Sequence, residues 1–370
     1  MMLNAAEVLY QTVRVRGGWD AARLKDAWLR TDPSGLRELV SYEQVTIWLY
    51  RRLRELGVGD ELPPAFWTWL IRRARVETAN GLLVEAEAIR LAELLTAGGI
   101  PAVFLKGIAR RLLADRYPYI DARATIDVDV LLPAEHASSV WEDLKKSGYK
   151  FVADPNLTPV DLWHLIPLAG ANRVAVEIHT STSREIKPPD AWRRQMFESQ
   201  VVTRDKLALR VPSVTELFWH TLTHAAGDHT NAFRLHYLLD AAVLMASDAA
   251  IYWDVIGERL NSREIRNRDT LLRWLQASAE LAGVPLHLHL GTMPRPFPML
   301  RVLKWRLAAF RRAGDRPRLL EKLLEEGTRI EAGMPMQELV KGKVLTLHAR
   351  RRTASTVARG AYYTWRMVKG

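Results

Sequence analysis

The chain has 370 residues, of which 48% are hydrophobic and 26% are charged, and it contains no cysteine. This composition is typical of a globular protein with a sizeable core, and it excludes disulfides, thiolate catalysis and cysteine-bound zinc. The sequence contains no apolar run of about 18 residues, which a membrane-spanning helix needs, and its start has no signal-peptide pattern. We therefore expect a cytoplasmic protein without a transmembrane span.

The net charge of +11 is concentrated at one end of the chain. Residues 301–370 hold 17 Lys and Arg against 6 Asp and Glu, so the first 300 residues are neutral overall. A basic segment of this kind favours RNA or another polyanion, an anionic membrane surface, or acidic parts of the protein itself. A solvated basic face without a partner is an equally weighted alternative.

The first region, residues 1–98, is expected to be helical. It ends with a stretch over 65–97 that is rich in Ala, Leu, Glu and Arg, which are good helix formers. Pro63-Pro64 precedes this stretch and Gly98-Gly99 follows it, which indicates where the helix begins and ends.

The second region, residues 99–211, is expected to form an α+β core with a mixed β-sheet and helices. Apolar and alternating runs predict its strands, which are expected at 102–105, 126–132, 149–152, 162–168 and 173–178. Periodic stretches predict helices over 108–114 and 135–146.

The third and fourth regions are expected to be helical again. Residues 212–293 should pack on the core, with helices at 213–226, 233–247, 252–260 and 269–282. Three prolines between 294 and 298 predict a linker, and residues 294–370 are expected to form basic amphipathic helices.

Two aspartates, Asp127 and Asp129, alternate with apolar residues in the predicted strand over 126–132. Side chains two residues apart on a strand point to the same face. Buried carboxylates held this close repel each other unless a cation lies between them, and oxygen ligands suit Mg²⁺ or Mn²⁺. Apolar Ile126 and Val128 favour burial of the strand, whereas an exposed edge strand with solvated aspartates is the alternative.

A third acid, Glu177, lies among apolar residues in the predicted strand over 173–178. If this strand pairs with that of Asp127 and Asp129, the three carboxylates form one catalytic cluster, which can hold two metal ions about 3.5–4 Å apart. The alternative is an isolated strand acid that pairs with a nearby arginine.

Lys106-Gly107 lies where the predicted strand over 102–105 leads into a helix. Free N–H groups at a helix start attract phosphate, and glycine allows the backbone to approach closely. Lys106 adds a positive charge, so this turn is a candidate phosphate-binding site, although most such pairs are ordinary helix starts.

Two histidines, His220 and His224, lie four residues apart in a predicted helix and are followed by Asp228 and His229. This spacing places His220 and His224 on one helix face. Such a pair could bind a transition metal, or the helix could line a nucleotide cleft in which His224 or His229 contacts phosphate. We favour the cleft because no glutamate lies in an H-E-x-x-H pattern. Hydrogen-bonded structural histidines are the further alternative.

Together these motifs resemble the uncharacterised nucleotidyltransferase family within the polymerase-β-like superfamily. The motifs that carry the resemblance are Leu105-Lys106-Gly107, Arg123, Asp127–Leu132, Val176–His179, His220–His224, His229, Arg234-Leu235 and Asp240. The resemblance implies a polymerase-β-like core in which Asp127, Asp129 and Glu177 bind the metal. The wider superfamily has Gly-Ser where this chain has Lys106-Gly107, and the close family more often has aspartate where this chain has Glu177.

The resemblance implies transfer of a nucleoside monophosphate from a nucleoside triphosphate (NTP) to an acceptor hydroxyl, with Mg²⁺ or Mn²⁺ as cofactor and release of pyrophosphate. The acceptor is a small molecule, a peptide or protein, or an RNA end. Lys106, Arg123, His224 and His229 would then contact the phosphates. Two alternatives stay open: a metal-dependent phosphohydrolase centred on His220, His224 and His229, and a non-catalytic nucleotide-binding module.

Overall fold

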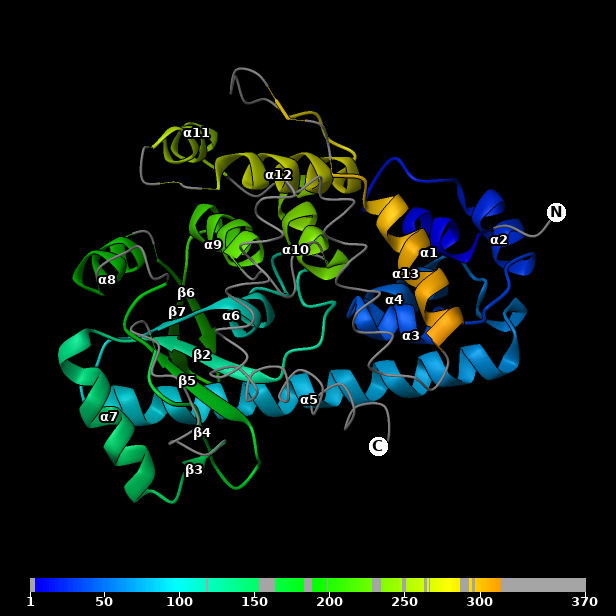
Figure 1. Cartoon of the computed structure of the whole chain (residues 1–370). Coiled ribbons are helices and arrows are strands. Elements are labelled where there is room, and N and C mark those ends of the chain that lie inside the picture. Colours follow the sequence, from blue (N-terminus) through cyan, green and yellow to red (C-terminus); the bar gives the residue numbers. More distant parts are fainter. Residues whose placement is uncertain are drawn as a thin grey trace.

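The computed structural model describes residues 4–117, 119–152, 164–182, 188–197, 199–227, 234–247, 251–262, 265, 267–286, 293–294 and 297–313. The protein is α+β, with helices on both sides of a mixed sheet (Figure 1). One large cluster of buried apolar residues extends from the N-terminal helices to the last described helix. No helix in the described part of the chain is long and apolar enough to cross a membrane.

The N-terminal region is helical, as expected. Asn4 and Asp20 cap the first two helices by accepting hydrogen bonds from the backbone N–H groups of Ala6 and Arg23. The elements are α1 (Ala5–Val13), α2 (Ala21–Leu29), α3 (Leu36–Tyr42), α4 (Thr46–Glu55), the 3₁₀ helix η1 (Gly59–Glu61) and α5 (Pro64–Ala97).

The main sheet has five strands in the order β1-β2-β5-β4-β3. They are β1 (Val103–Phe104), β2 (Asp127–Leu131), β3 (Lys150–Phe151), β4 (Leu168–Ala169) and β5 (Ala175–His179). β2 and β5 are parallel, and the other neighbours are antiparallel. Strands β1, β2 and β3 lie within the predicted runs over 102–105, 126–132 and 149–152, and β5 overlaps the run over 173–178. The prediction of a strand over 162–168 was largely wrong: β4 overlaps this run only at Leu168, His164 makes an isolated bridge, and residues 162 and 163 lie outside the described part.

Three helices and a hairpin complete this region. They are α6 (Lys106–Leu112), α7 (Ala134–Lys146), α8 (Pro188–Phe197) and the hairpin of β6 (Gln200–Arg204) and β7 (Leu207–Val211). The sequence patterns did not predict this hairpin. The hairpin forms a separate two-stranded sheet, and its strand β7 contacts β1 of the main sheet.

Helix α5 connects the N-terminal helices to the sheet. Its 34 residues correspond to a length of about 50 Å, and it contacts α4 as well as β2 and α6. Proline suits the first turn of a helix, which agrees with the start at Pro64. After the helix, Gly99 adopts a left-handed φ of 65°.

The four helices predicted after residue 212 are present. They are α9 (Val214–Gly227), α10 (Leu235–Ala246), α11 (Trp253–Asn261) and α12 (Arg268–Ala282). Helices α9, α10 and α12 pack together, and α9 also contacts α6. In Figure 1, α9 and α10 lie above α6 and α5 lies below it, so α6 is enclosed between two helical layers.

The last described helix, α13 (Met299–Ala313), packs against α1 and α3. Phe297, within the predicted linker, is buried. The first part of the basic segment therefore belongs to the folded core, while residues 314–370 lie outside the described part. The division of the chain into four regions stays a prediction.

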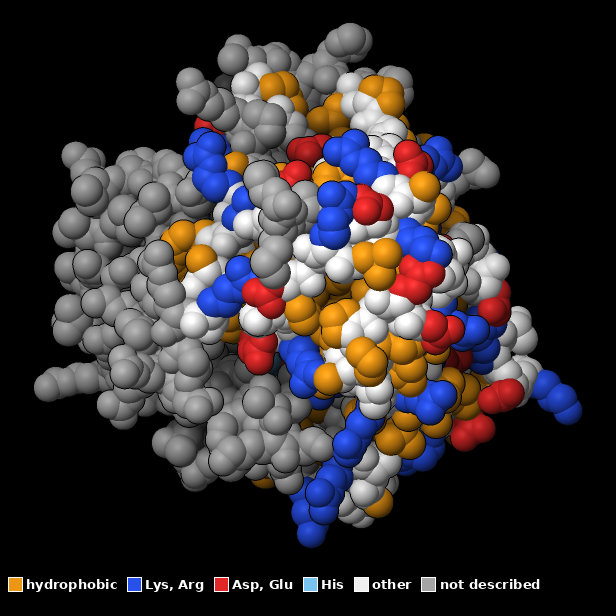
Figure 2. Space-filling model, turned by 90° about the vertical axis from the view of Figure 1, so that its right-hand side faces the viewer, with side chains coloured by type: hydrophobic (Ala, Val, Ile, Leu, Met, Phe, Trp, Pro, Cys, Tyr) orange, Lys and Arg blue, Asp and Glu red, His pale blue; other side chains and the backbone are white. Residues whose placement is uncertain are grey.

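Figure 2 shows the side of the molecule that carries the N-terminal helices. Lys and Arg side chains are interspersed there with Asp and Glu, and hydrophobic side chains lie between them. This mixture agrees with the neutral overall charge of the first 300 residues.

Candidate functional site

Two parallel strands bring the three predicted acids together. In the pairing of β2 with β5, Asp129 lies opposite Glu177 and Asp127 lies opposite Ala175. Alternate side chains of a strand share a face, so Asp127 and Asp129 point to the same side, while Val128 between them is fully buried. The pairing that the three-acid hypothesis required is therefore present.

The two aspartates differ in their exposure to solvent. Asp129 is 1% exposed, whereas Asp127, at the first position of β2, is partly exposed. The strand is buried from Val128 to Leu131, as expected, whereas Ile126, just before the strand, is 51% exposed. The site is therefore buried at Asp129 and opens towards solvent at Asp127.

A compact group of possible metal ligands consists of Asp129, Glu177 and His179. One ligand atom from each residue lies within 4.8 Å of the others. His179 Nε2 is 2.8 Å from Asp129 Oδ1 and 3.7 Å from Glu177 Oε2. Asp127 is not in this group, although it lies on the same strand face. His179 is a component that the sequence analysis did not select as a site residue.

Lys106 joins the carboxylates from the neighbouring turn. Its ammonium Nζ donates a hydrogen bond to Asp129 Oδ1 over 2.6 Å and lies 3.9 Å from Glu177 Oε2. The backbone N–H of Leu105 donates to the carbonyl of Asp129 over 2.9 Å, which holds this turn against β2. Lys106 itself has a φ of 49°, a rare conformation for a residue with a side chain.

Gly107 allows this turn to pack closely against the chain that leads into β2. A Cβ atom at position 107 would lie 2.9 Å from Cγ2 and 3.2 Å from Oγ1 of Thr125, which is buried. Any side chain here would therefore push apart the turn and the segment that carries Asp127. The need for glycine at this position is explained by this packing.

The charges of the site perturb one another. Burial, together with the carboxylates of Asp129 and Glu177, raises the pKa of Asp127 to about 7. Lys106 and His179 hold the pKa of Asp129 well below its usual range, and they lower that of Glu177, although burial acts in the opposite sense on both. Burial lowers the pKa of Lys106, but the three carboxylates outweigh it and raise that pKa above its ordinary value.

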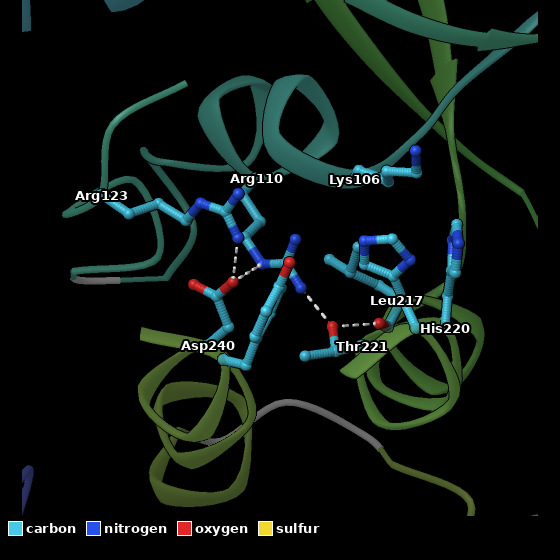
Figure 3. Close-up of a pocket in the computed structure, with 9 residues that line it drawn as sticks. Lys106, Arg110, Arg123, Leu217, His220, Thr221 and Asp240 are labelled. Atoms are coloured by element: carbon cyan, nitrogen blue, oxygen red, sulfur yellow. Dashed lines mark hydrogen bonds and ion pairs between the residues drawn. The ribbon is translucent and has the colours of Figure 1, made fainter. Parts of the chain in front are cut away.

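A small basic pocket lies beside Lys106 (Figure 3). Helices α6, α9 and α10 and the loop before β2 form its wall; the residues that line it are Lys106, Arg110, Arg123, Leu217, His220, Thr221, His224, Tyr237 and Asp240. Lys106 lines the pocket and also contacts Asp129, so the pocket and the carboxylate cluster form one continuous site.

The predicted phosphate-contacting residues are distributed as follows. Lys106, Arg123 and His224 line the pocket, and Gly107 lies at its turn. His229 lies outside the described residues.

The pocket also contains residues that the sequence analysis did not assign to the site. Asp240 accepts a hydrogen bond from Arg123 NH1 over 2.6 Å. Arg110 is a second buried arginine beside Asp240. Arg110 lies four residues after Lys106 and therefore on the same helix face, and this spacing could have indicated from the sequence that it belongs to the site.

The fold and the site together define an α+β protein in which strand carboxylates and a histidine can hold a metal ion beside a basic pocket. The chain belongs to the uncharacterised nucleotidyltransferase family, which it matches over residues 30–278. This match extends from the end of α2 through most of α12 and includes the whole site. No curated protein matches the chain. Family membership supports a transferase that uses an NTP as substrate, and it does not specify the acceptor.

Proposed function

We propose that the protein transfers a nucleoside monophosphate from an NTP to an acceptor hydroxyl. The acceptor oxygen forms a bond to the α-phosphorus, the bond from that phosphorus to the bridging oxygen breaks, and pyrophosphate leaves. The observation that carries this proposal is the register of β2 and β5, which places Asp129 opposite Glu177 with the Lys106 ammonium beside them. Membership of a nucleotidyltransferase family supports the same reaction.

The donor atoms of the site fit a divalent cation. Asp129, Glu177 and His179 would hold it, and in the two-metal form of the reaction Asp127 would join them as a ligand. Carboxylates suit Mg²⁺ and Mn²⁺ alike, whereas the imidazole of His179 favours Mn²⁺. When bound, the cation would neutralise phosphate charge and favour ionisation of the attacking hydroxyl.

The chain's own residues would position the triphosphate and receive the proton. Lys106 and Arg123 neutralise phosphate charge, and the side chain of Glu177, which is 24% exposed, is accessible to an acceptor hydroxyl and takes its proton. His224 lies on the pocket wall, where it would contact the phosphates. The close packing of Gly107 on Thr125 keeps the turn of Lys106 at a fixed distance from β2.

The test is incubation with each α-³²P-labelled NTP, Mg²⁺ or Mn²⁺, and cell extract. We expect label in an RNA, protein or small-molecule fraction, and loss of that label in the Asp127→Asn/Asp129→Asn variant. Asp143→Asn is the matched control, because Asp143 is an exposed aspartate on α7 that pairs only with its helix neighbour Lys146 among the described residues. The absence of label from every fraction would favour a non-catalytic nucleotide-binding module.

The phosphohydrolase alternative has less support in the described residues. The rings of His220 and His224 lie 6.1 Å apart in an edge-on arrangement, and His224 packs on Tyr237. Within the described chain, the group of possible metal ligands is the strand cluster and not these histidines. His224→Ala should therefore weaken nucleotide binding without abolishing metal binding. If the protein were instead a phosphohydrolase centred on the histidines, His224→Ala would abolish its activity and Asp127→Ala would leave that activity intact.

RNA is the acceptor class that the basic segment favours. Within α13, the cations Lys304, Arg306 and Arg311 already pair with acids of the N-terminal region. Binding of RNA would therefore depend on residues 314–370. We expect tRNA binding that weakens steeply with salt, and a smaller salt slope when the run Arg350–Arg352 is changed to serine. Absence of binding at low salt would exclude RNA.

A further inference from the structure

The pocket beside Lys106 contains more buried positive charge than its own acid can neutralise. Arg110 and Arg123 both face Asp240: Arg123 NH1 lies 2.6 Å and Arg110 Nε 3.5 Å from the same oxygen, Oδ2 (Figure 3). Two guanidinium groups thus share one carboxylate. The charge of Lys106 is already paired with Asp129 and Glu177 of the neighbouring carboxylate cluster. These two acids do not contact Arg110 or Arg123 in any ion pair of the described residues.

The uncompensated charge is buried, which makes it energetically costly. Arg110 is 3% exposed and Asp240 is 6% exposed. Burial, the neighbouring His224 and the positive charge of Lys106 lower the pKa of His220, so this pocket residue is neutral near pH 7 and does not change the charge balance of the pocket. A buried cation without a full counter-charge destabilises a fold unless an anion completes the pairing.

Arg110 also retains an unused hydrogen-bond donor. Its NH2 donates to the hydroxyl of Thr221, which in turn donates to the carbonyl of Leu217 over 2.7 Å. Its buried Nε has no hydrogen-bond partner among the described atoms. A guanidinium held in this way presents donors in the planar arrangement that phosphate oxygens match.

We propose that this pocket binds the terminal phosphates of the NTP without a metal ion, with Arg110 and Arg123 as ligands and Asp240 as their internal counter-ion. The inference rests on the proposed function, since it takes the polyphosphate chain of the same substrate as the ligand. Lys106 lies between the pocket and the carboxylates, so a phosphate chain that leaves the pocket passes its ammonium before it reaches Asp129.

The test is calorimetric titration of the full-length protein with inorganic tripolyphosphate in the presence of EDTA. Wild type should bind it, and Arg110→Gln should lose about ten-fold or more in affinity, as expected for a charge-assisted hydrogen bond. The matched control is Arg111→Gln on the same helix, because Arg111 is also buried but pairs with Glu85 on α5, away from the pocket. This control should bind like wild type.

Two further variants keep the test decisive if Arg110→Gln does not fold. Arg123, whose side chain is 19% exposed, lies at the pocket edge, and Arg123→Gln should weaken binding. Asp240→Asn should strengthen it, because the competing carboxylate is removed. The proposal is overturned if wild type does not bind tripolyphosphate in EDTA, or if the pocket arginine variants bind as the Arg111 control does.

The outcome is separable from that of the proposed function. Tripolyphosphate binding that depends on Arg110, in a protein that transfers no label, would support the pocket and refute the transferase. Transfer that requires Asp127 and Asp129, with polyphosphate binding indifferent to Arg110, would support the transferase and refute the pocket.

Discussion

The attachment of α13 to the rest of the fold depends on a fully buried ion pair. Arg306 on α13 is 1% exposed and Glu43, at the end of α3, is 0% exposed; Arg306 NH1 lies 2.5 Å from Glu43 Oε1. The other oxygen of Glu43 accepts a hydrogen bond from the backbone N–H of Leu235 over 2.7 Å. One carboxylate therefore joins α3, α13 and the first residue of α10, the helix that carries Asp240.

We expect Arg306→Met to destabilise the protein by about 3–5 kcal/mol, because Glu43 would remain buried without its counter-charge. The comparison is Lys304→Met, two residues earlier. Lys304 Nζ lies 2.7 Å from Glu7 Oε2, a similar separation, but these side chains are 39% and 35% exposed. An exposed pair of this kind contributes about 0–1 kcal/mol, so burial and not distance should separate the two variants.

The assay is equilibrium urea unfolding of both single variants and of the double variant Glu43→Gln/Arg306→Met. The glutamine keeps an acceptor for Leu235 N–H and removes the unpaired charge, so the double variant should recover most of the stability that Arg306→Met loses. Equal losses below about 1 kcal/mol in the Arg306 and Lys304 variants would refute the reasoning, since the buried pair would then act like a surface one.

Three further predictions concern packing, pH and metal. Gly107→Ala should lower the free energy of unfolding by about 1–3 kcal/mol, because its Cβ would overlap with Thr125. Addition of Thr125→Ser removes the overlapping Cγ2 and should restore much of this stability. An unchanged free energy of unfolding in Gly107→Ala would contradict the contact. Burial, with help from Arg123, lowers the folded-state pKa of His236 well below its ordinary value, so the unfolded chain takes up the proton first and stability falls as pH drops below about 6.5. His236→Asn should reduce that pH slope by up to about 1.4 kcal/mol per unit, as urea unfolding between pH 7 and 5 will reveal; an unchanged slope would exclude His236 as the source. Mn²⁺ at 100 times its Kd should stabilise wild type by about 2.7 kcal/mol in a thermal melt, reversibly with EDTA, and Asp129→Asn should abolish this shift; an equal shift in the variant would place the metal elsewhere.

Local periodicity was sufficient to predict part of the site. The alternation of Asp127 and Asp129 with apolar residues placed both acids on one strand face before any pairing was known. The same period applied to Glu177 points to His179, two residues further on, which lies in the metal-ligand group. What periodicity cannot supply is the register of two strands separated by about fifty residues, which alone sets Asp129 opposite Glu177.

The hairpin of β6 and β7 was missed because its turn lacks the usual sequence signal. Two-residue hairpin turns of type I′ require positive φ at both central positions, which Asn-Gly or Asp-Gly adopts readily. Here the turn residues are Asp205 and Lys206, with φ of 47° and 70°. A lysine in this conformation is uncommon, so the sequence gives no indication that the chain reverses at this point.

The basic C-terminal segment illustrates what composition cannot resolve. The excess positive charge lies in residues 301–370, and such an excess is typical of a segment that binds a polyanion. A count of charges does not show, however, which of them are already paired within the fold. In the fold, Lys304, Arg306 and Arg311 each pair with an acid of the N-terminal region, and Arg306 does so in the core. Helix α13 lies beyond the family match at residue 278, yet it packs on α1, which lies before it. The two ends of the described chain therefore stabilise each other, and the ion pair of Arg306 with Glu43 extends that support to α10 and the wall of the pocket beside Lys106.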